Sequence, residues 1–261
     1  MISKRSLLCF ERFLFLGRNE IVIFVEKMLE TPLQILYKDE YIVAINKPHN
    51  LLVHRSSIAA QENEFALQIL RDQLNCWVNP CHRIDRKTGG ILLFSLSKEA
   101  DRAMQMKFEN REIDKNYLAL VRGFLLEKGL TDRPLENEKG VMKDAITHFK
   151  CLQQVELDIE VSRYSKSRYS LAEISPETGR THQIRRHFAQ MRHYLIGDKT
   201  YGDCKHNKMF EACFGLNTML LHARELSFEH PFTKEKMIIT APLHKEFTGI
   251  LEKIGMILSE F

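Results

Sequence analysis

The order of strand-like and helix-like segments is the feature that most restricts the fold of this chain. From residue 35 onward, a segment with a strand-type apolar pattern is followed by another such segment as often as by a segment with helical periodicity. Expected strands cover 35–37, 41–45, 91–96, 115–122, 145–155, 168–174, 219–228 and 236–240, and expected helices cover 65–74, 97–109, 180–193 and 244–254. A doubly wound parallel sheet needs strict alternation. The sequence therefore predicts an α+β domain whose mixed, largely antiparallel central sheet is flanked by helices.

The first 27 residues differ from the rest because apolar and charged residues interrupt one another. Glu11, Arg12, Arg18 and Glu20 break the apolar runs, whereas a signal peptide has an uninterrupted one. No apolar run in the chain reaches the roughly 18 residues that cross a bilayer. We expect residues 1–27 to be a leader that is disordered or follows from a misassigned start, residues 28–261 to form one domain, and no membrane partner.

Six cysteines are scattered without the spacing of a disulfide framework, which favours a reducing, cytoplasmic compartment. The segments 76–82 and 204–206 combine cysteine and histidine. Neither has the Cys-x2-Cys spacing of a zinc knuckle. The sequence therefore predicts no metal site.

The positive charge of the chain is concentrated in one segment. Residues 180–208 contain seven Lys or Arg and two Asp, a net charge of 7 − 2 = +5, whereas the whole chain carries +4 and the remainder therefore −1. Such a concentration indicates a local site for a polyanion. A solvated basic face without a partner has the same composition, and charge alone leaves both interpretations open.

The segment 82–90 contains a candidate catalytic carboxylate. Asp85 is flanked by three cations, Arg83, Arg86 and Lys87, which favour its ionised form. The two glycines that end the segment allow the backbone to approach a ligand closely. An Asp that caps a turn before a strand is very common, and on this loop alone that interpretation is favoured.

Two further segments carry candidate residues. Arg180 lies where a turn enters an expected helix and can face an anion, and Arg185 and Arg186 follow one turn later and suit phosphate contacts. Tyr117 lies on an expected strand, on the same face as Ala119 and Val121. The alternatives are a solvated basic helix for the arginines and a core position for the tyrosine.

Together these segments resemble the pseudouridine synthases of the ribosomal large-subunit uridine synthase A type. The segment 82–90 resembles the catalytic loop of that family, 115–123 its tyrosine strand and 179–185 its arginine motif. Further landmarks, at 46–48, 197–202 and 220–223, follow in the expected order, so that the resemblance spans about residues 33–242. Gly89 stands where the family usually has Ser, and Ile84 where it usually has Leu.

The resemblance implies the pseudouridine synthase fold for residues 28–261 and the isomerisation of a uridine in RNA without a metal or redox cofactor. Asp85 is the implied catalytic carboxylate, either attacking covalently or abstracting a ribose proton. Arg180 is implied to pair with Asp85 and to orient it. Tyr117 is implied to stack on the uracil, in a pocket that Leu221 lines.

The resemblance also implies contacts with the RNA around the reacting base. The target base must leave its stack, and Arg83 is implied to fill the space that it vacates. Arg185 and Arg186 are implied to hold phosphates.

The likeness is strongest to the members that modify uridine 65 in the T-arm stem of tRNA, judged from residues 52–56, 185–193 and the insert before Arg168. The expected partner is therefore tRNA, with a large-subunit rRNA uridine as the alternative, and a monomer without an obligatory protein partner. Two other classes stay open. One is a non-catalytic RNA-binding protein, with Gly89 as a sign of decay, and the other is a metal-dependent hydrolase using His82 and Asp85.

Overall fold

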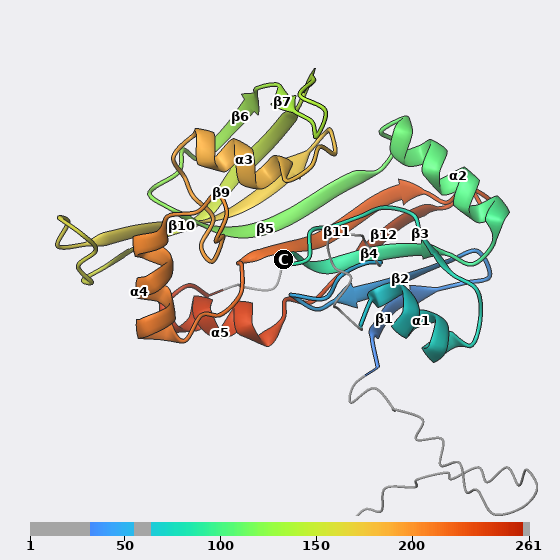
Figure 1. Ribbon diagram of the computed structural model, residues 1–261, viewed down its shortest axis with the longest axis horizontal. Coiled ribbons are helices and arrows are strands. Elements are labelled where there is room, and N and C mark those ends of the chain that lie inside the picture. The colour runs from blue at the N-terminus through green and yellow to red at the C-terminus, as the bar shows by residue number, and fades with distance from the viewer. Residues whose placement is uncertain (1–31, 55–63, 258–261) are drawn as a thin grey trace, which may run out of the picture. The chain divides into compact units, whose positions relative to one another are not determined.

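The computed structural model describes residues 32–54 and 64–257 (Figure 1). The chain divides into two units, Met1–Pro32 and Leu33–Phe261, and the second contains every element described below. The expected leader, residues 1–27, and the expected boundary at residue 28 lie outside the described residues. Within the described part of the chain, no helix has both the length and the apolar character needed to cross a membrane.

A ten-stranded sheet forms the centre of the second unit. Its main path runs β1 (Gln34–Lys38), β2 (Ile42–Lys47), β4 (Gly89–Ser95), β11 (Leu221–Glu229), β5 (Asp114–Arg122), β10 (Ser167–Pro176), β9 (Ile146–Leu157) and β6 (Lys128–Asp132). In addition, β12 (Lys236–Thr240) pairs with β11 and β3 (Asn79–Pro80) with β4, while β7 (Leu135–Glu136) and β8 (Met142–Lys143) form a separate pair. Among these pairs only β4–β11 is parallel. The prediction of an α+β fold with a mixed, largely antiparallel sheet is confirmed.

Five helices are described: α1 (Ala66–Leu74), α2 (Lys98–Glu109), α3 (Gln183–Gln190), α4 (Cys204–Phe214) and α5 (Lys245–Lys253). The side chain of Ser97, the first residue of the expected helix 97–109, caps α2 by accepting a hydrogen bond from the amide of Ala100 at 3.1 Å. The expected helix 180–193 is shorter in the structure because His182, which precedes α3, has a left-handed backbone with φ of 55°. The helix α4 was not predicted.

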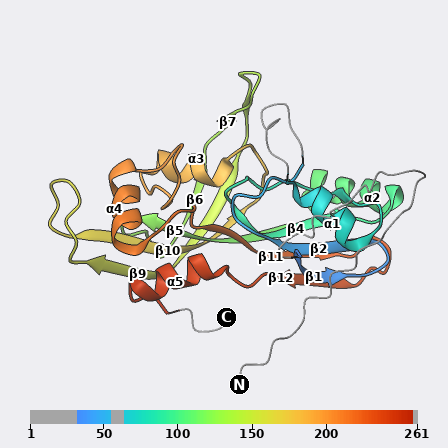
Figure 2. The ribbon, with the colours of Figure 1, turned by 60° about the horizontal axis from the view of Figure 1, so that its bottom comes forward.

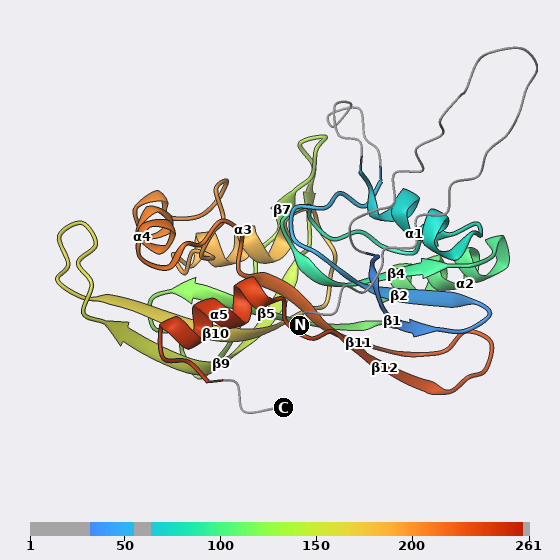
Figure 3. The same ribbon diagram turned by 90° about the horizontal axis from the view of Figure 1, so that it is seen from below.

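The two faces of β5 are covered by different helices, as alternation along a strand requires. On one face, Leu118 and Leu120 pack with side chains of α4 and α5 such as Phe210 and Phe247. On the other face, Ala119 and Val121 belong to the cluster that includes Ile184 and Phe188 of α3. Figures 2 and 3 show α3 and α5 on opposite sides of these strands. The helix that carries the arginine motif therefore lies on the face of β5 that also presents Tyr117.

The parallel contact between β4 and β11 requires glycine. Gly90 pairs with Ala223 and has φ of +101°, and a Cβ atom at this position would lie 2.2 Å from the carbonyl oxygen of Ala223. The same register pairs Gly89 with His222. The loop that contains Asp85 is thereby held at the middle of the sheet, where β4 begins.

Candidate active site

The loop that carries Asp85 is fastened to the end of β2 by a buried lysine. The ammonium group of Lys47 donates hydrogen bonds to the carbonyl oxygens of Pro48 at 2.8 Å, Leu51 at 2.9 Å and Arg86 at 3.1 Å. Three carbonyl acceptors require three N–H donors, which only the charged form provides. Burial lowers the pKa of Lys47 to about 7, an effect that the negative charge of Asp85 opposes. The form of Lys47 that can donate to all three carbonyls therefore predominates only at about pH 7 and below.

Arg185 joins two carboxylates. Its Nη1 donates to Oδ2 of Asp85 at 2.8 Å, while its Nε and Nη2 donate to the two carboxylate oxygens of Asp198 at 2.8 and 2.9 Å. The side chain of Arg185 is 5% exposed and that of Asp198 1%, whereas that of Asp85 is 25% exposed. Burial alone would lower the pKa of Arg185, but the two carboxylates outweigh it and raise the pKa. A permanent cation thus orients a carboxylate that solvent and ligands can reach.

Asp198 is itself held in place by backbone hydrogen bonds. Its Oδ1 also accepts hydrogen bonds from the backbone amides of Thr200 at 2.8 Å and Tyr201 at 3.2 Å. Burial acts to raise the pKa of Asp198, but Arg185 and these amides lower it further than burial raises it. The guanidinium carbon of Arg185 lies 5.1 Å from the centre of the Tyr201 ring. The position of Arg185 is therefore determined by a charge pair on one side and an aromatic face on another.

Tyr117 lies near Asp85 on the α3 side of the sheet. It packs against the cluster of Ala119, Val121 and Leu221, as the strand alternation predicts. Burial raises the pKa of Tyr117, and the negative charge of Asp85 raises it further, so that the phenol is neutral at pH 7. Tyr117 and Asp85, which are far apart in the sequence, are therefore close enough in the structure to interact electrostatically. Leu221 is 3% exposed and belongs to the same cluster.

His182 is a further residue at this site, within the segment 179–185, and the sequence predicts no role for it. Its Nε2 lies 3.9 Å from Oδ1 of Asp85, and its Nδ1 is 3.1 Å from the hydroxyl of Tyr201. Burial lowers the pKa of His182, while Asp85 acts in the opposite direction. The left-handed backbone of residue 182 turns this ring toward the carboxylate rather than continuing the helix.

The expected pairing of Arg180 with Asp85 is wrong. Arg180 lies in the turn before α3, where its Nε donates to the carbonyl oxygen of Asp144 at 3.0 Å and its backbone amide to Oε1 of Gln183, also at 3.0 Å. Because α3 begins at Gln183, Arg185 occupies its first turn and takes the position facing Asp85. Arg185 was also expected to hold phosphates, but its side chain is 5% exposed and three of its five N–H donors contact the two carboxylates.

The other expected RNA-contacting residues lie at the surface. Arg83 is exposed two positions before Asp85, and Arg186 is partly exposed, with its Nη1 donating to the carbonyl oxygen of Glu136 at 2.8 Å. The cations of the basic segment that are exposed are Arg192, Lys199, Lys205 and Lys208. The segment that supplies Arg185 to the site therefore also carries four exposed cations.

This geometry suits reactions that need a positioned carboxylate beside a neutral phenol. The carboxylate can attack an electrophilic carbon or accept a proton from one. The buried Arg185–Asp198 pair keeps the position of Asp85 independent of any ligand.

Comparison with known proteins finds similar chains over most of this sequence. Residues 41–190 match the RNA pseudouridylate synthase family. The tRNA pseudouridine synthase C of Vibrio cholerae serotype O1 is 42% identical over 234 residues, 85% of this chain and 96% of that protein. The protein of the same name from Haemophilus ducreyi is 41% identical over 239 residues, 88% of this chain and 98% of that protein.

Solved structures are similar over most of the fold. Human RNA Pseudouridylate Synthase Domain Containing 1 is 25% identical with a TM-score of 0.63, over 81% of this chain and 83% of that one. Human RNA Pseudouridylate Synthase Domain Containing 4, 24% identical, gives a TM-score of 0.66 over 85% and 92% and shows the shared fold. The matched segment contains Asp85, Tyr117 and Arg185, and the chain belongs to the RNA pseudouridylate synthase family.

Proposed function

We propose that this protein is an isomerase that converts a uridine of tRNA to pseudouridine, with Asp85 as the catalytic carboxylate. The observation that carries the proposal is the Asp85–Arg185–Asp198 arrangement, in which a reachable carboxylate is oriented by a buried cation beside Tyr117. The names of the relatives, tRNA pseudouridine synthase C, support tRNA as the substrate.

The reaction breaks the bond between N1 of uracil and C1′ of ribose, rotates the base, and forms a bond from C5 to C1′. Asp85 either attacks covalently and later leaves, or removes a ribose proton and later returns it, and both routes regenerate the enzyme. C5 then loses its proton, and N1 gains one. Arg185 orients the carboxylate for either route. The neutral ring of Tyr117 provides a surface on which the uracil stacks.

A base in a stem must leave its stack before it can reach Asp85, which costs a few kcal/mol. Arg83 is exposed and close to Asp85 along the chain, so that its side chain is suited to occupy the vacated space. The exposed cations Arg192, Lys199, Lys205 and Lys208, together with Arg186, are suited to hold the phosphates. Leu221 belongs to the cluster against which Tyr117 packs, and it is proposed to contact the uracil.

Uridine 65 in the T-arm stem is the proposed position, with the protein acting as a cytoplasmic monomer without an obligatory partner. The test is a pseudouridine map of tRNA and large-subunit rRNA from a deletion strain, complemented with the wild-type gene or with Asp85→Asn. The proposal expects the loss of one tRNA pseudouridine, at position 65, restored only by the wild type. A loss confined to rRNA would replace tRNA with rRNA as the substrate, and unchanged maps would refute the proposed activity.

A further inference from the structure

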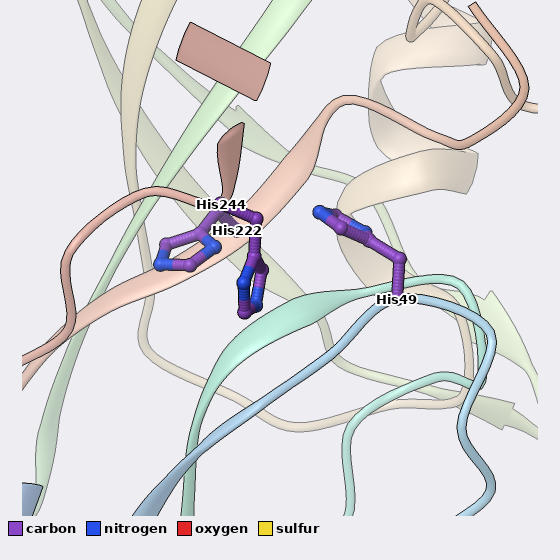
Figure 4. Close-up of side chains that lie close together, drawn as sticks. All are labelled: His49, His222 and His244. Atoms are coloured by element: carbon purple, nitrogen blue, oxygen red, sulfur yellow. The ribbon is translucent and has the colours of Figure 1, made fainter. Parts of the chain in front are cut away.

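Three histidines from distant parts of the chain gather next to the loop that carries Asp85. His49 follows β2, His222 lies on β11, and His244 immediately precedes α5. One nitrogen of each ring lies within 4.8 Å of the others. The ring centres of His244 are 5.2 Å from His49 and 5.3 Å from His222. Figure 4 shows the ring of His49 pointing toward the other two.

The cluster contains ring nitrogens that lack protein partners. His222 is 0% exposed, and neither of its ring nitrogens is in hydrogen-bond geometry with a described residue, although the backbone of Ala241 lies near the ring. Nε2 of His49 is buried and also without a partner among the described residues. Buried polar atoms normally have a partner. In a neutral His222 one ring nitrogen carries the proton, so His222 and His49 each offer one buried lone pair without a described protein donor, which indicates a ligand that accepts lone pairs.

The remaining hydrogen bonds leave lone pairs available at the centre of the cluster. Nδ1 of His49 is 2.8 Å from the carbonyl oxygen of Lys87, and Nε2 of His244 is 2.9 Å from that of Lys47. A carbonyl only accepts, so each of these nitrogens carries the proton and the opposite nitrogen has a free lone pair. A ring that donates to a carbonyl with one nitrogen and offers the other is the usual arrangement of a metal-binding histidine.

Gly89 provides the space for this cluster. A Cβ atom at residue 89 would lie 2.8 Å from Nε2 of His49 and 2.8 Å from Cδ2 of His244. Any larger residue would push these rings apart. The glycine that replaces the usual serine of the resembled loop thus has a structural reason, and it is not in itself a sign of lost activity.

We propose that His49, His222 and His244 bind one divalent transition metal ion, with zinc as the best match. Three imidazole ligands with a fourth position for water suit zinc, whose bonds to nitrogen of about 2.0–2.1 Å place tetrahedral ligands about 3.4 Å apart. The ring nitrogens now lie within 4.8 Å of one another. Side-chain rotations that move each nitrogen by roughly 1 Å bring them to the separation of about 3.4 Å that zinc requires. His49 supplies Nε2 and His244 supplies Nδ1.

The ion has a structural role. Leu221 faces the cluster that contains Tyr117, and the next residue, His222, therefore points to the opposite side of β11. Through His49 and His244 the ion is connected to the backbone of Lys87 and Lys47, and Lys47 in turn holds Arg86. The metal fastens the loop of Asp85 from behind without contacting the reacting base. The sequence predicts no such site because its three ligands come from separate segments.

The test uses the purified full-length protein, stripped with a chelator and titrated with Zn²⁺ or Co²⁺. The variants are His49→Gln and His244→Gln, and the matched control is His148→Gln, whose ring is exposed and paired with Glu177. Metal content by mass spectrometry, binding affinity by competition with a chelating dye, and the melting temperature are measured. The Co²⁺ absorption spectrum reports the ligand type.

We expect one Zn²⁺ per chain for the wild type and the control, a higher melting temperature with metal, and a Co²⁺ spectrum without thiolate bands. Each cluster variant should bind Zn²⁺ more than about tenfold more weakly, and Gly89→Ala should have the same effect by displacing the rings. Stripped wild-type protein that binds no Zn²⁺, equal affinity in the cluster variants, or thiolate bands from the cysteines would each overturn the proposal.

Discussion

Replacing Asp198 by Asn isolates the contribution of positioning to the proposed reaction, because Asp198 does not contact the reacting base. Asp198 accepts two of the three hydrogen bonds that Arg185 makes to carboxylates. Both side chains are almost completely buried. Removing one partner of such a pair costs about 3–5 kcal/mol of stability. Because Asn keeps one acceptor oxygen, we expect a loss near 3 kcal/mol.

The effect on turnover follows from the position of Asp85. Without the second carboxylate, Arg185 can rotate toward Asp85 and shift it, and a misplacement near 1 Å costs on the order of 100-fold in rate. This corresponds to about 2.7 kcal/mol of activation free energy. RNA binding involves other residues, so that Asp198→Asn should lower kcat about 100-fold while KM changes less than about threefold. Single-turnover tritium release from RNA labelled at C5 of uridine measures the chemical step.

Asp203→Asn is the matched control for this substitution. Asp203 lies in the same basic segment, pairs with Arg122 at 2.7 Å and caps α4, but its side chain is 20% exposed. Asn is an equally good cap, and a partly exposed pair such as Arg122–Asp203 contributes about 1 kcal/mol. Its kcat should stay within twofold. Equal kcat values for Asp198→Asn and the wild type, in folded protein, would refute the positioning role of the buried pair.

Further substitutions test the pairing of Arg185 rather than Arg180 with Asp85, the role of Gly90 in the sheet and the role of Lys47 in holding the Asp85 loop. Arg185→Lys should lower kcat at least about 100-fold, since an ammonium group cannot bridge two carboxylates as a guanidinium does. The kcat of Arg180→Lys should stay within threefold of the wild type. The reverse order in the tritium-release assay would restore the expected pairing of Arg180 with Asp85. Gly90→Ala places a Cβ 2.2 Å from a carbonyl oxygen, and should lower the free energy of unfolding in urea by more than about 2 kcal/mol. Burial lowers the pKa of Lys47 from 10.5 to about 7, so the unfolded chain binds this proton more tightly than the folded protein does. The stability of the wild type relative to Lys47→Met should therefore increase as the pH rises from 7 toward 10. A stability difference that does not vary with pH would contradict this sign.

The strands near the active site follow from side-chain patterning, because one face of each is buried. The alternation along residues 115–122 correctly places Tyr117 with Ala119 and Val121, and the segment is β5 in the structure. The capping signal of Ser97 likewise marks the start of α2. These elements are predictable because the deciding interactions are local in sequence.

The helix α4 was missed because its polar and charged residues read as part of a basic run. Its local signals were nevertheless present. Asp203 is an N-cap residue whose side chain accepts from the amides of Lys205 and His206, and Gly215 ends the helix in a left-handed conformation. A search for capping residues, rather than for apolar periodicity alone, would have predicted it.

Which arginine faces Asp85 depends on a single backbone conformation. Had the helix begun at Arg180, a different side chain would have been directed at the carboxylate. The left-handed residue 182 delays the start to Gln183 and brings Arg185 into place. No pattern of residue types specifies that conformation. Asp198, one of two acidic residues in a basic segment, was the available signal for a buried partner.

The most direct test of the catalytic assignment is pseudouridine formation by Asp85→Asn, measured together with its affinity for the RNA. The amide preserves the size of the side chain but can neither attack as a carboxylate nor accept a proton as one. We expect RNA binding within a few-fold of the wild type and no detectable pseudouridine under single-turnover conditions. Turnover at a rate comparable to that of the wild type would remove residue 85 from the reaction and contradict the account.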